Sequence, residues 1–204
     1  QNKYDLNALF VDYPNLRSVI GSNGSDKRMR PNAFVNLSAV FHEKKQSNDD
    51  IMIHGLMNNK RTIRYINRKY LAPQSNFEKY KVLVPTANGS GAIGEKLSTP
   101  LIGTPLIGYT QTFISFGSFE TVDVANNCMK YIKSKFARTL LGILKVTQNN
   151  SKDTWRLVPL QDFTSASDID WSQSIDDIDE QLYSKYNLTD EEIEFIERNI
   201  QPMD

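Results

Sequence analysis

Two apolar runs separated by a long loop dominate the middle of this 204-residue chain. The runs, at residues 80–85 and 109–116, are rich in β-branched and aromatic residues and are bounded by glycine and proline. That combination is typical of strands. The chain must therefore carry the loop between two strands, and we predict a polar, flexible loop on a sheet.

The loop contains Gly89, Gly91 and Gly94, which match the G-x-G-x-x-G pattern of dinucleotide-binding sites. That pattern needs a helix whose N-terminal amides face the phosphates, beginning at the third glycine. Pro100 and Pro105 prevent a helix of useful length there. A dinucleotide site is therefore the weaker interpretation.

Composition limits the kinds of site that the chain can carry. Cys128 is the single cysteine, so neither an internal disulfide nor a thiolate metal cluster is available. His42 and His54 are the only histidines and cannot make a zinc site by themselves. No segment has the run of about 18 apolar residues that a membrane span needs. We expect a cytoplasmic protein without a metal centre. Because Gln1 stands where a methionine would start a chain, we also expect a piece of a longer protein.

A formal net charge of zero conceals a strong charge asymmetry. Residues 162–204 contain 13 acidic and 2 basic residues, for a net charge of −11, so residues 1–161 carry +11. A basic body with an acidic tail favours a polyanionic partner for the body. An ordinary solvated surface with an acidic helix pair explains the counts as well. An alternative function is a protein-interaction module whose acidic C-terminal helices bind the partner. We expect a basic α/β core over residues 1–161 and an acidic helical appendage, residues 162–204, packed on it.

A basic loop follows the N-terminal residues, at 21–34 (GSNGSDKRMRPNAF). Glycine and asparagine favour turns. Arginine and asparagine side chains can make paired hydrogen bonds to a base edge. Arg28, Arg30 and Asn32, with Lys27 beside them, are therefore candidates for holding nucleic acid, and a solvated turn is the alternative.

The most basic run is KRTIRYINRKY, at residues 60–70. Cations interleaved with tyrosines are typical of surfaces that contact phosphates. Periodicity does not decide between a helix and a strand, and in either case we expect the cations on one side. The cations are Lys60, Arg61, Arg64, Arg68 and Lys69.

An enzymatic alternative comes from Glu43 and Lys45, with Asp26 upstream, which together resemble the carboxylates and lysine of a metal-dependent nuclease. Such a site needs a strand that fixes both carboxylates on one metal ion, and this part of the sequence is typical of a loop.

Apolar residues at spacings of three and four predict one long helix over residues 121–146, with Thr121 as its N-cap. Cys128 falls on its buried face, and Lys130, Ser134, Arg138 and Lys145 fall on the opposite face. We further predict strands at 50–57 and 155–160, a strand or short helix at 34–41, and two acidic helices that begin after Ser174 and Thr189. The expected fold class is α+β: a twisted, mostly antiparallel sheet with long loops, one long packed helix and two acidic C-terminal helices.

Several segments in this order resemble a known family. They are SNGSDKRMRPNAF, TIRYINRKYL, YKVLVPTANGSG, GYTQTFISFGSF, ANNCMKYIKSKFARTLLGILKVTQ, WRLVPLQDF and LYSKYNLTDEEIEFIE. The series is similar to the C-terminal target-recognition domain of adenine-specific DNA methyltransferases of bacterial type II restriction–modification systems, including fused methylase–endonuclease chains. The resemblance extends from about Gly21 onward.

The resemblance implies that this chain reads double-stranded DNA. The family's catalytic tetrapeptide (Asn, Asp or Ser before Pro-Pro-aromatic) and its S-adenosylmethionine loop do not occur here. No catalytic centre is therefore implied in this chain. S-adenosylmethionine would bind the parent's N-terminal catalytic domain, which would also be a partner of this one. The matching positions are 27–32, 60–69 and 88–91, which add Asn88 and Ser90 to the candidate site, and Gln111 is a further candidate for base contacts.

Overall fold

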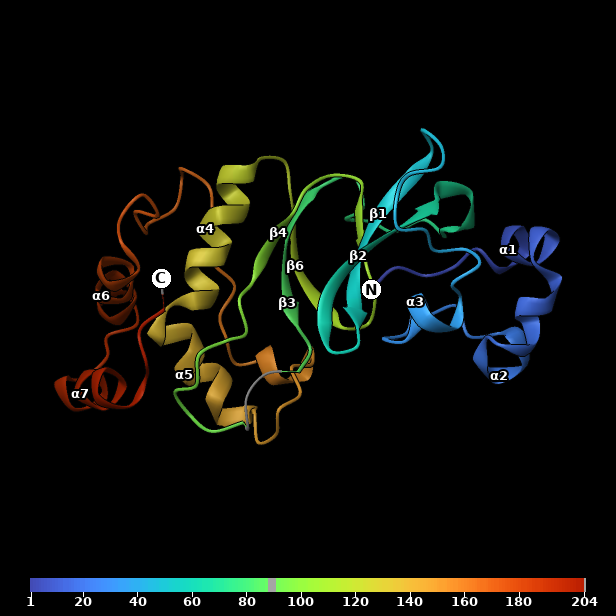
Figure 1. The fold of residues 1–204 in the computed structure, drawn as a ribbon. Helices are drawn as coiled ribbons and strands as arrows, with labels where there is room; N and C mark the ends of the chain where they lie inside the picture. The colour runs from blue at the N-terminus through green and yellow to red at the C-terminus, as the bar shows by residue number, and fades with distance from the viewer. Residues whose placement is uncertain (88–90, 204) are drawn as a thin grey trace. The chain divides into compact units, whose positions relative to one another are not determined.

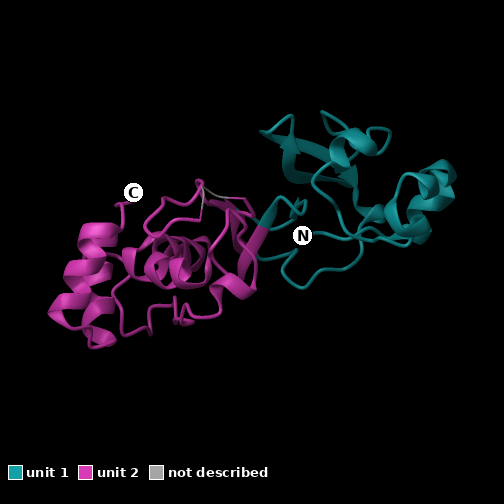
Figure 2. Ribbon diagram, turned by 90° about the horizontal axis from the view of Figure 1, so that it is seen from below, with its two compact units in different colours: residues 1–79, 103–113 teal, residues 80–102, 114–204 magenta. Residues whose placement is uncertain are grey.

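The computed structural model describes residues 1–87 and 91–203. It shows an α+β fold that divides into two compact units (Figure 1, Figure 2). Unit 1 comprises residues 1–79 and 103–113, and unit 2 comprises residues 80–102 and 114–204. Each unit has an apolar core of its own.

Unit 1 is built on a sheet with the strand order β2–β1–β5. Strand β1 (Asp50–Met57) pairs antiparallel with β2 (Lys60–Asn67) and parallel with β5 (Ile107–Tyr109). Asn58 and Asn59 join β1 to β2 with φ angles of 51° and 59°. Two positive φ angles in a two-residue loop match the twist of the flanking strands. The predicted bounds of β1 are confirmed.

Short helices accompany this sheet, and apolar residues from both fill the core of unit 1. Ile53 and Ile66 are completely buried. Gly55 lets the ring of Phe34 lie against the sheet, since a β-carbon there would come within 2.6 Å of the ring. The helical segments are α1 (Leu6–Asp12), η1 (Pro14–Ser18), α2 (Gly21–Gly24), α3 (Ala33–Asn36) and η2 (Arg68–Tyr70).

Unit 2 is built on a sheet with the strand order β4–β3–β6. Helix α4 (Val122–Lys133) packs against β3 (Tyr80–Pro85), where Val82 and Val84 are completely buried. The predicted bounds of β3 are confirmed. The remaining elements are β4 (Leu101–Gly103), β6 (Phe113–Phe119), α5 (Lys135–Leu144), η3 (Asp153–Trp155), α6 (Ile175–Lys185) and α7 (Asp190–Asn199).

Two predicted strands are wrong. The run at 109–116 is not one strand, because the chain turns at Thr110–Thr112 between β5 and β6. The N–H of Phe113 donates to the Thr110 carbonyl over 3.2 Å, and the hydroxyls of Thr110 and Thr112 are 2.8 Å apart. The predicted strand at 155–160 is replaced by η3 and a turn. There the Val158 N–H donates to the Trp155 carbonyl at 3.0 Å. In both places local hydrogen bonds close a turn that the strand preference of the side chains did not predict.

The helix predicted over residues 121–146 is interrupted at Ser134, whose ψ of 149° is not helical. Thr121 caps the first piece as predicted. The Ser134 hydroxyl caps α5, and the carboxylate of Asp179 accepts the N–H groups of Lys135 at 2.9 Å and Phe136 at 2.8 Å. The N–H groups at the buried start of α5 therefore have acceptors. This stabilises a break at Ser134 relative to one continuous helix.

The side of this helix pair that was predicted to be polar is largely buried. Ser134, Arg138 and Lys145 are each at most 4% exposed. Arg138 donates to the carbonyls of Lys133 and Gln201, and Lys145 lies 3.6 Å from the carboxylate of Glu95. These acceptors replace water, so both cations are structural. Cys128 is buried as predicted, and burial raises the pKa of its thiol to about 12.

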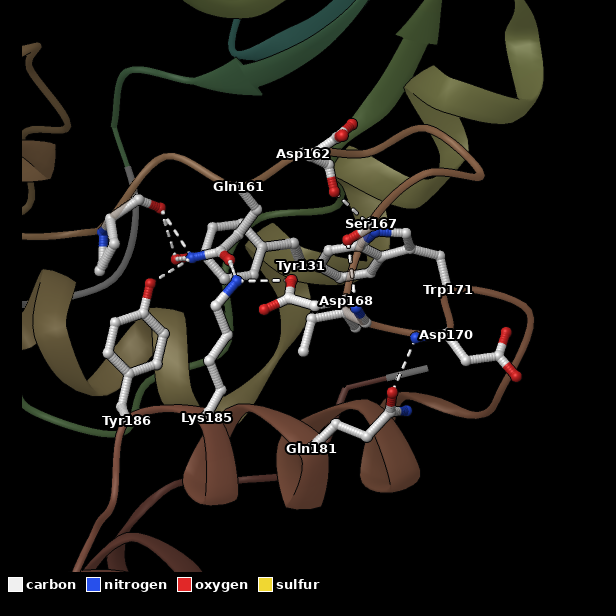
Figure 3. Close-up of polar contacts among 12 residues, drawn as sticks. Tyr131, Gln161, Asp162, Ser167, Asp168, Asp170, Trp171, Gln181, Lys185 and Tyr186 are labelled. Atoms are coloured by element: carbon white, nitrogen blue, oxygen red, sulfur yellow. Dashed lines mark hydrogen bonds and ion pairs between the residues drawn. The ribbon is translucent and has the colours of Figure 1, made fainter.

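The acidic helices α6 and α7 belong to the core of unit 2, where Ile178 and Ile196 are buried with the residues of β3. Figure 3 shows how the preceding loop is fastened to α6. Lys185 donates to Asp168 at 2.7 Å and to Gln161 at 2.9 Å. Residues 162–204 therefore pack within unit 2, whereas a boundary was expected after residue 161. The predicted helix starts after Ser174 and Thr189 are confirmed, and Thr189 forms a capping box with Glu192.

The two units carry opposite net charges. Unit 1 has 13 basic and 7 acidic residues, and unit 2 has 11 basic and 17 acidic residues, so their net charges are +6 and −6. No helix within residues 1–87 and 91–203 is long and apolar enough to cross a membrane.

The start of α5 gives a test of the packing in unit 2. Burial raises the pKa of Asp179 to about 6, although the N–H groups of Phe136 and Lys135 oppose the shift. Because the pKa of Asp179 is higher in the folded state, its contribution to the unfolding free energy is fully present below pH 4. That contribution is lost as the pH rises through 6. We predict that the unfolding free energy of the wild type, minus that of Asp179→Asn, falls by up to about 3 kcal/mol between pH 4 and 7. Urea titrations at each pH measure it, and a constant or rising difference would contradict the assignment.

Candidate nucleic-acid interface

The chain around Met29 is held as an extra, strand-like segment of unit 1. The Tyr4 N–H donates to the Lys27 carbonyl at 2.7 Å, and the Met29 N–H donates to the Asn2 carbonyl at 3.1 Å. The Gln111 N–H donates to the Met29 carbonyl at 2.7 Å. Met29 itself is completely buried. Backbone pairing thus fixes the basic loop and brings Gln111 beside it, although more than 70 residues separate them in the sequence.

A left-handed turn precedes this segment. Ser22, Asn23 and Gly24 have φ angles of 58°, 55° and 79°. A β-carbon at Gly24 would come within 2.7 Å of the Arg17 side chain, so glycine is required there for both conformation and space. The turn directs the chain back, and the N–H of Asp26 donates to the carbonyl of Gly21.

The carboxylate of Asp26 holds two predicted site residues, Arg28 and Arg30. Nε and Nη2 of Arg28 lie 2.9 and 3.0 Å from its two oxygens, and Nε of Arg30 lies 2.6 Å from Oδ2. The Asp26 side chain is 6% exposed, whereas those of Arg28 and Arg30 are 48% and 47% exposed. The Arg28 hydrogen bond, supported by Arg30, holds the pKa of Asp26 well below its usual range. One buried anion therefore orients two half-exposed guanidinium groups.

Arg28, Arg30 and Asn32 line one polar pocket of about 150 Å³. Asp26 and Asn36 also line it, as does Tyr4 from the N-terminal segment. Asp26 was not predicted in this role, although its place two and four residues before the arginines is a usable signal. Nothing in the sequence indicated that Tyr4 would lie there.

The second basic run does not present all its cations on one side, contrary to the prediction. Because β2 is a strand, successive side chains point to opposite faces. Arg64 shares a face with the buried Ile66, and its side chain is 15% exposed. Arg61 lies on the other face, 5.9 Å from the centre of the Phe113 ring. The helical alternative would have placed Arg61 and Arg64 together.

Several of these cations are paired with acidic side chains within unit 1. Exposed pairs of this kind contribute only about 0–1 kcal/mol each, so a phosphate can replace the carboxylate at little cost. Among these cations Arg64 has the least exposed side chain, so its ion pair is the hardest for a phosphate to replace. The pairs are Arg64 with Glu43 at 3.0 Å, Arg68 with Glu78 at 2.6 Å and Lys69 with Asp12 at 2.7 Å.

The remaining predicted residues fall into two groups. Lys27 and Lys60 are exposed, and among the described residues neither has an ion pair. Asn88 and Ser90 lie outside the described residues. The structure therefore gathers Arg28, Arg30 and Asn32 around one pocket, with the backbone of Gln111 paired to Met29. It places Lys60, Arg61 and Arg64 on β2, and Arg68 and Lys69 in η2, of the same unit.

The enzymatic alternatives have less support in the geometry. Asp26 and Glu43 are each in ion pairs with arginines. The part of the chain that the structure describes holds no group of three or more His, Cys, Asp or Glu residues suited to a metal ion. Residues 91–100, which include the last two glycines of the pattern, contain no helix, as predicted.

Unit 2 contains a larger pocket, of about 400 Å³, with aromatic walls formed by Phe116, Phe119, Tyr131, Trp155 and Phe163. Cys128 lines it as a neutral thiol, since its pKa is raised. This pocket can hold an apolar group, and Asp162 is the one carboxylate among the described residues that line it. Comparison of the chain with protein-family models, curated proteins and solved structures finds no match.

We predict that Asp26→Asn lowers the unfolding free energy at pH 7 by about 1–3 kcal/mol, because hydrogen bonds to a buried carboxylate are lost. The depressed pKa of Asp26 means that its stabilisation is present above about pH 4 and is lost as the pH falls further. The difference in unfolding free energy between the wild type and Asp26→Asn should therefore be smaller at pH 3 than at pH 7. Chemical denaturation at both pH values measures it, with the exposed Asp49→Asn as the matched control. Equal effects of the two substitutions would refute the role of Asp26.

Proposed function

We propose that unit 1 binds double-stranded DNA and that Arg28, Arg30, Asn32 and Gln111 contact base edges. The observation that carries this proposal is the common pocket lined by the first three residues, with Gln111 joined to Met29 beside them. These are residue types that form paired hydrogen bonds with bases in the major groove.

The Asp26 cluster has the properties of a prepared donor site. Each guanidinium has five N–H groups, and the contacts with Asp26 use Nε and Nη2 of Arg28 and Arg30. Other N–H groups on both arginines are left for acceptors on a ligand. Two guanidinium groups against one carboxylate keep a net positive charge. Side chains that are already oriented lose less conformational entropy on binding.

Phosphate contacts in this proposal come first from the exposed Lys27 and Lys60, within a unit of net charge +6. Arg68 and Lys69 join them when DNA replaces Glu78 and Asp12, since these pairs are exposed. Such contacts set affinity and salt dependence but do not read sequence. Base contacts contribute about 1–3 kcal/mol of discrimination each.

The resemblance extends the proposal to the parent protein. We infer that the chain is the target-recognition domain of an adenine-specific DNA methyltransferase from a type II or fused methylase–endonuclease system, acting in the cytoplasm. S-adenosylmethionine and the methyl-transfer chemistry would belong to an N-terminal catalytic domain. The support is the order of the resembling segments together with the clustered arginines.

The test compares two double variants that remove the same charge. Binding of the chain to a labelled duplex of randomised sequence is measured by fluorescence anisotropy over a range of salt concentrations. We predict that Arg28→Gln with Arg30→Gln raises Kd by about tenfold or more, the loss expected for two contacts to DNA. The control, Lys44→Gln with Lys45→Gln, also lies in unit 1, on exposed residues, and should change Kd by less than about threefold.

An equal rise in Kd for the two double variants would mean that DNA binding is general electrostatic attraction, and would contradict a specific role of Arg28 and Arg30. Absence of DNA binding by the wild type would overturn the proposal. Cleavage of DNA by the purified chain with magnesium would contradict it in favour of a nuclease.

A further inference from the structure

Unit 2 exposes a groove between α5 and α7 that the proposed DNA binding does not use. It has a volume of about 360 Å³ and an apolar floor. Ile143 and Phe195 line it and are 54% and 50% exposed. We call it the α5–α7 groove. Its apolar residues are Phe136, Leu140, Ile143, Leu188, Phe195 and Ile196.

The spacing of these residues matches the packing surface of a third helix. Phe136, Leu140 and Ile143 are four and three residues apart on α5 and therefore share one face. Phe195 lies on α7, and Leu188 lies just before the N-cap of that helix, Thr189. An apolar groove between two helices is a usual receptor for the apolar face of an amphipathic helix. Phe136 stacks on Tyr186 at 4.8 Å, which fixes one end of the floor.

The charges around the groove select the partner. The charged residues that line it are Glu191 and Glu192. Glu192 accepts the N–H and hydroxyl of Thr189, and these bonds lower its pKa, so it remains ionised. Helix α7 carries five acidic residues and one arginine, and that arginine is ion-paired with Glu194. A cationic partner is attracted to this rim, whereas an anionic one is repelled.

We propose that the α5–α7 groove binds an amphipathic helix of a partner protein, with leucine-like residues in the groove and lysine or arginine beside Glu191 and Glu192. This site lies in unit 2 and is independent of DNA binding by unit 1. Unit 2 then serves as the attachment point for a basic helix while unit 1 contacts nucleic acid.

The test uses two fluorescein-labelled model peptides. Both have leucine at helical spacings of three and four residues, and the remaining positions are lysine in one and glutamate in the other. Anisotropy with the whole chain should show binding of the lysine peptide, with the glutamate peptide at least about tenfold weaker.

Three single variants locate the contact. Phe195→Gln in the groove should weaken the lysine peptide by about tenfold or more. Glu191→Lys should weaken it and strengthen the glutamate peptide. Leu160→Gln is the matched control, because Leu160 is 92% exposed and does not line the groove. All three positions are exposed, and thermal unfolding followed by circular dichroism verifies that the variants stay folded.

Equal binding of the two peptides, or equal weakening by Phe195→Gln and Leu160→Gln, would overturn the proposal. A chain that dimerises in sedimentation experiments, and that becomes monomeric with Phe195→Gln, would assign the groove to a second copy and would also overturn it. The proposal would also be overturned if neither peptide bound to the chain.

Discussion

A single buried carboxylate organises the surface on which the proposed function depends. Asp26 is held in place by a left-handed turn before it and by strand-like pairing after it. Its two oxygens then orient Arg28 and Arg30, whose side chains remain about half exposed. Without that anion the two guanidinium groups would repel each other and move freely. With it, they line one pocket together with Asn32.

The distribution of charge assigns the two units different tasks in this account. Unit 1 carries +6 and most of the predicted contact residues, whereas unit 2 carries −6. The acidic helices of unit 2 pack into its core, where Asp179 caps α5 and Lys185 fastens the loop before α6. Their carboxylates would repel a phosphate backbone, so unit 2 is better suited to a basic protein segment than to DNA.

Sequence reasoning succeeded where the signals are local. The bounds of β1 and β3 follow from short apolar runs between turn residues, and the starts of α6 and α7 follow from Ser174 and Thr189 as caps. It failed where a distant residue decides the outcome. The break at Ser134 is stabilised by Asp179 from another helix, which no pattern within residues 121–146 can reveal.

The same limit applies to the candidate site. Residue type alone indicated Arg28, Arg30 and Asn32, but their meeting with Gln111 depends on backbone pairing between segments far apart in the sequence. In the basic run, strand geometry rather than composition separates Arg61 from Arg64. Ion pairs with Glu43, Glu78 and Asp12 also lower the free positive charge below what the count of cations suggests.

Hydrogen–deuterium exchange of the whole chain, with and without a saturating DNA duplex, tests whether the residues around Asp26 contact DNA. We predict slower exchange on DNA binding in the peptides that cover residues 26–32 and 109–112, with α6 and α7 unchanged. Protection confined to unit 2, or protection that leaves residues 26–32 unchanged, would contradict it.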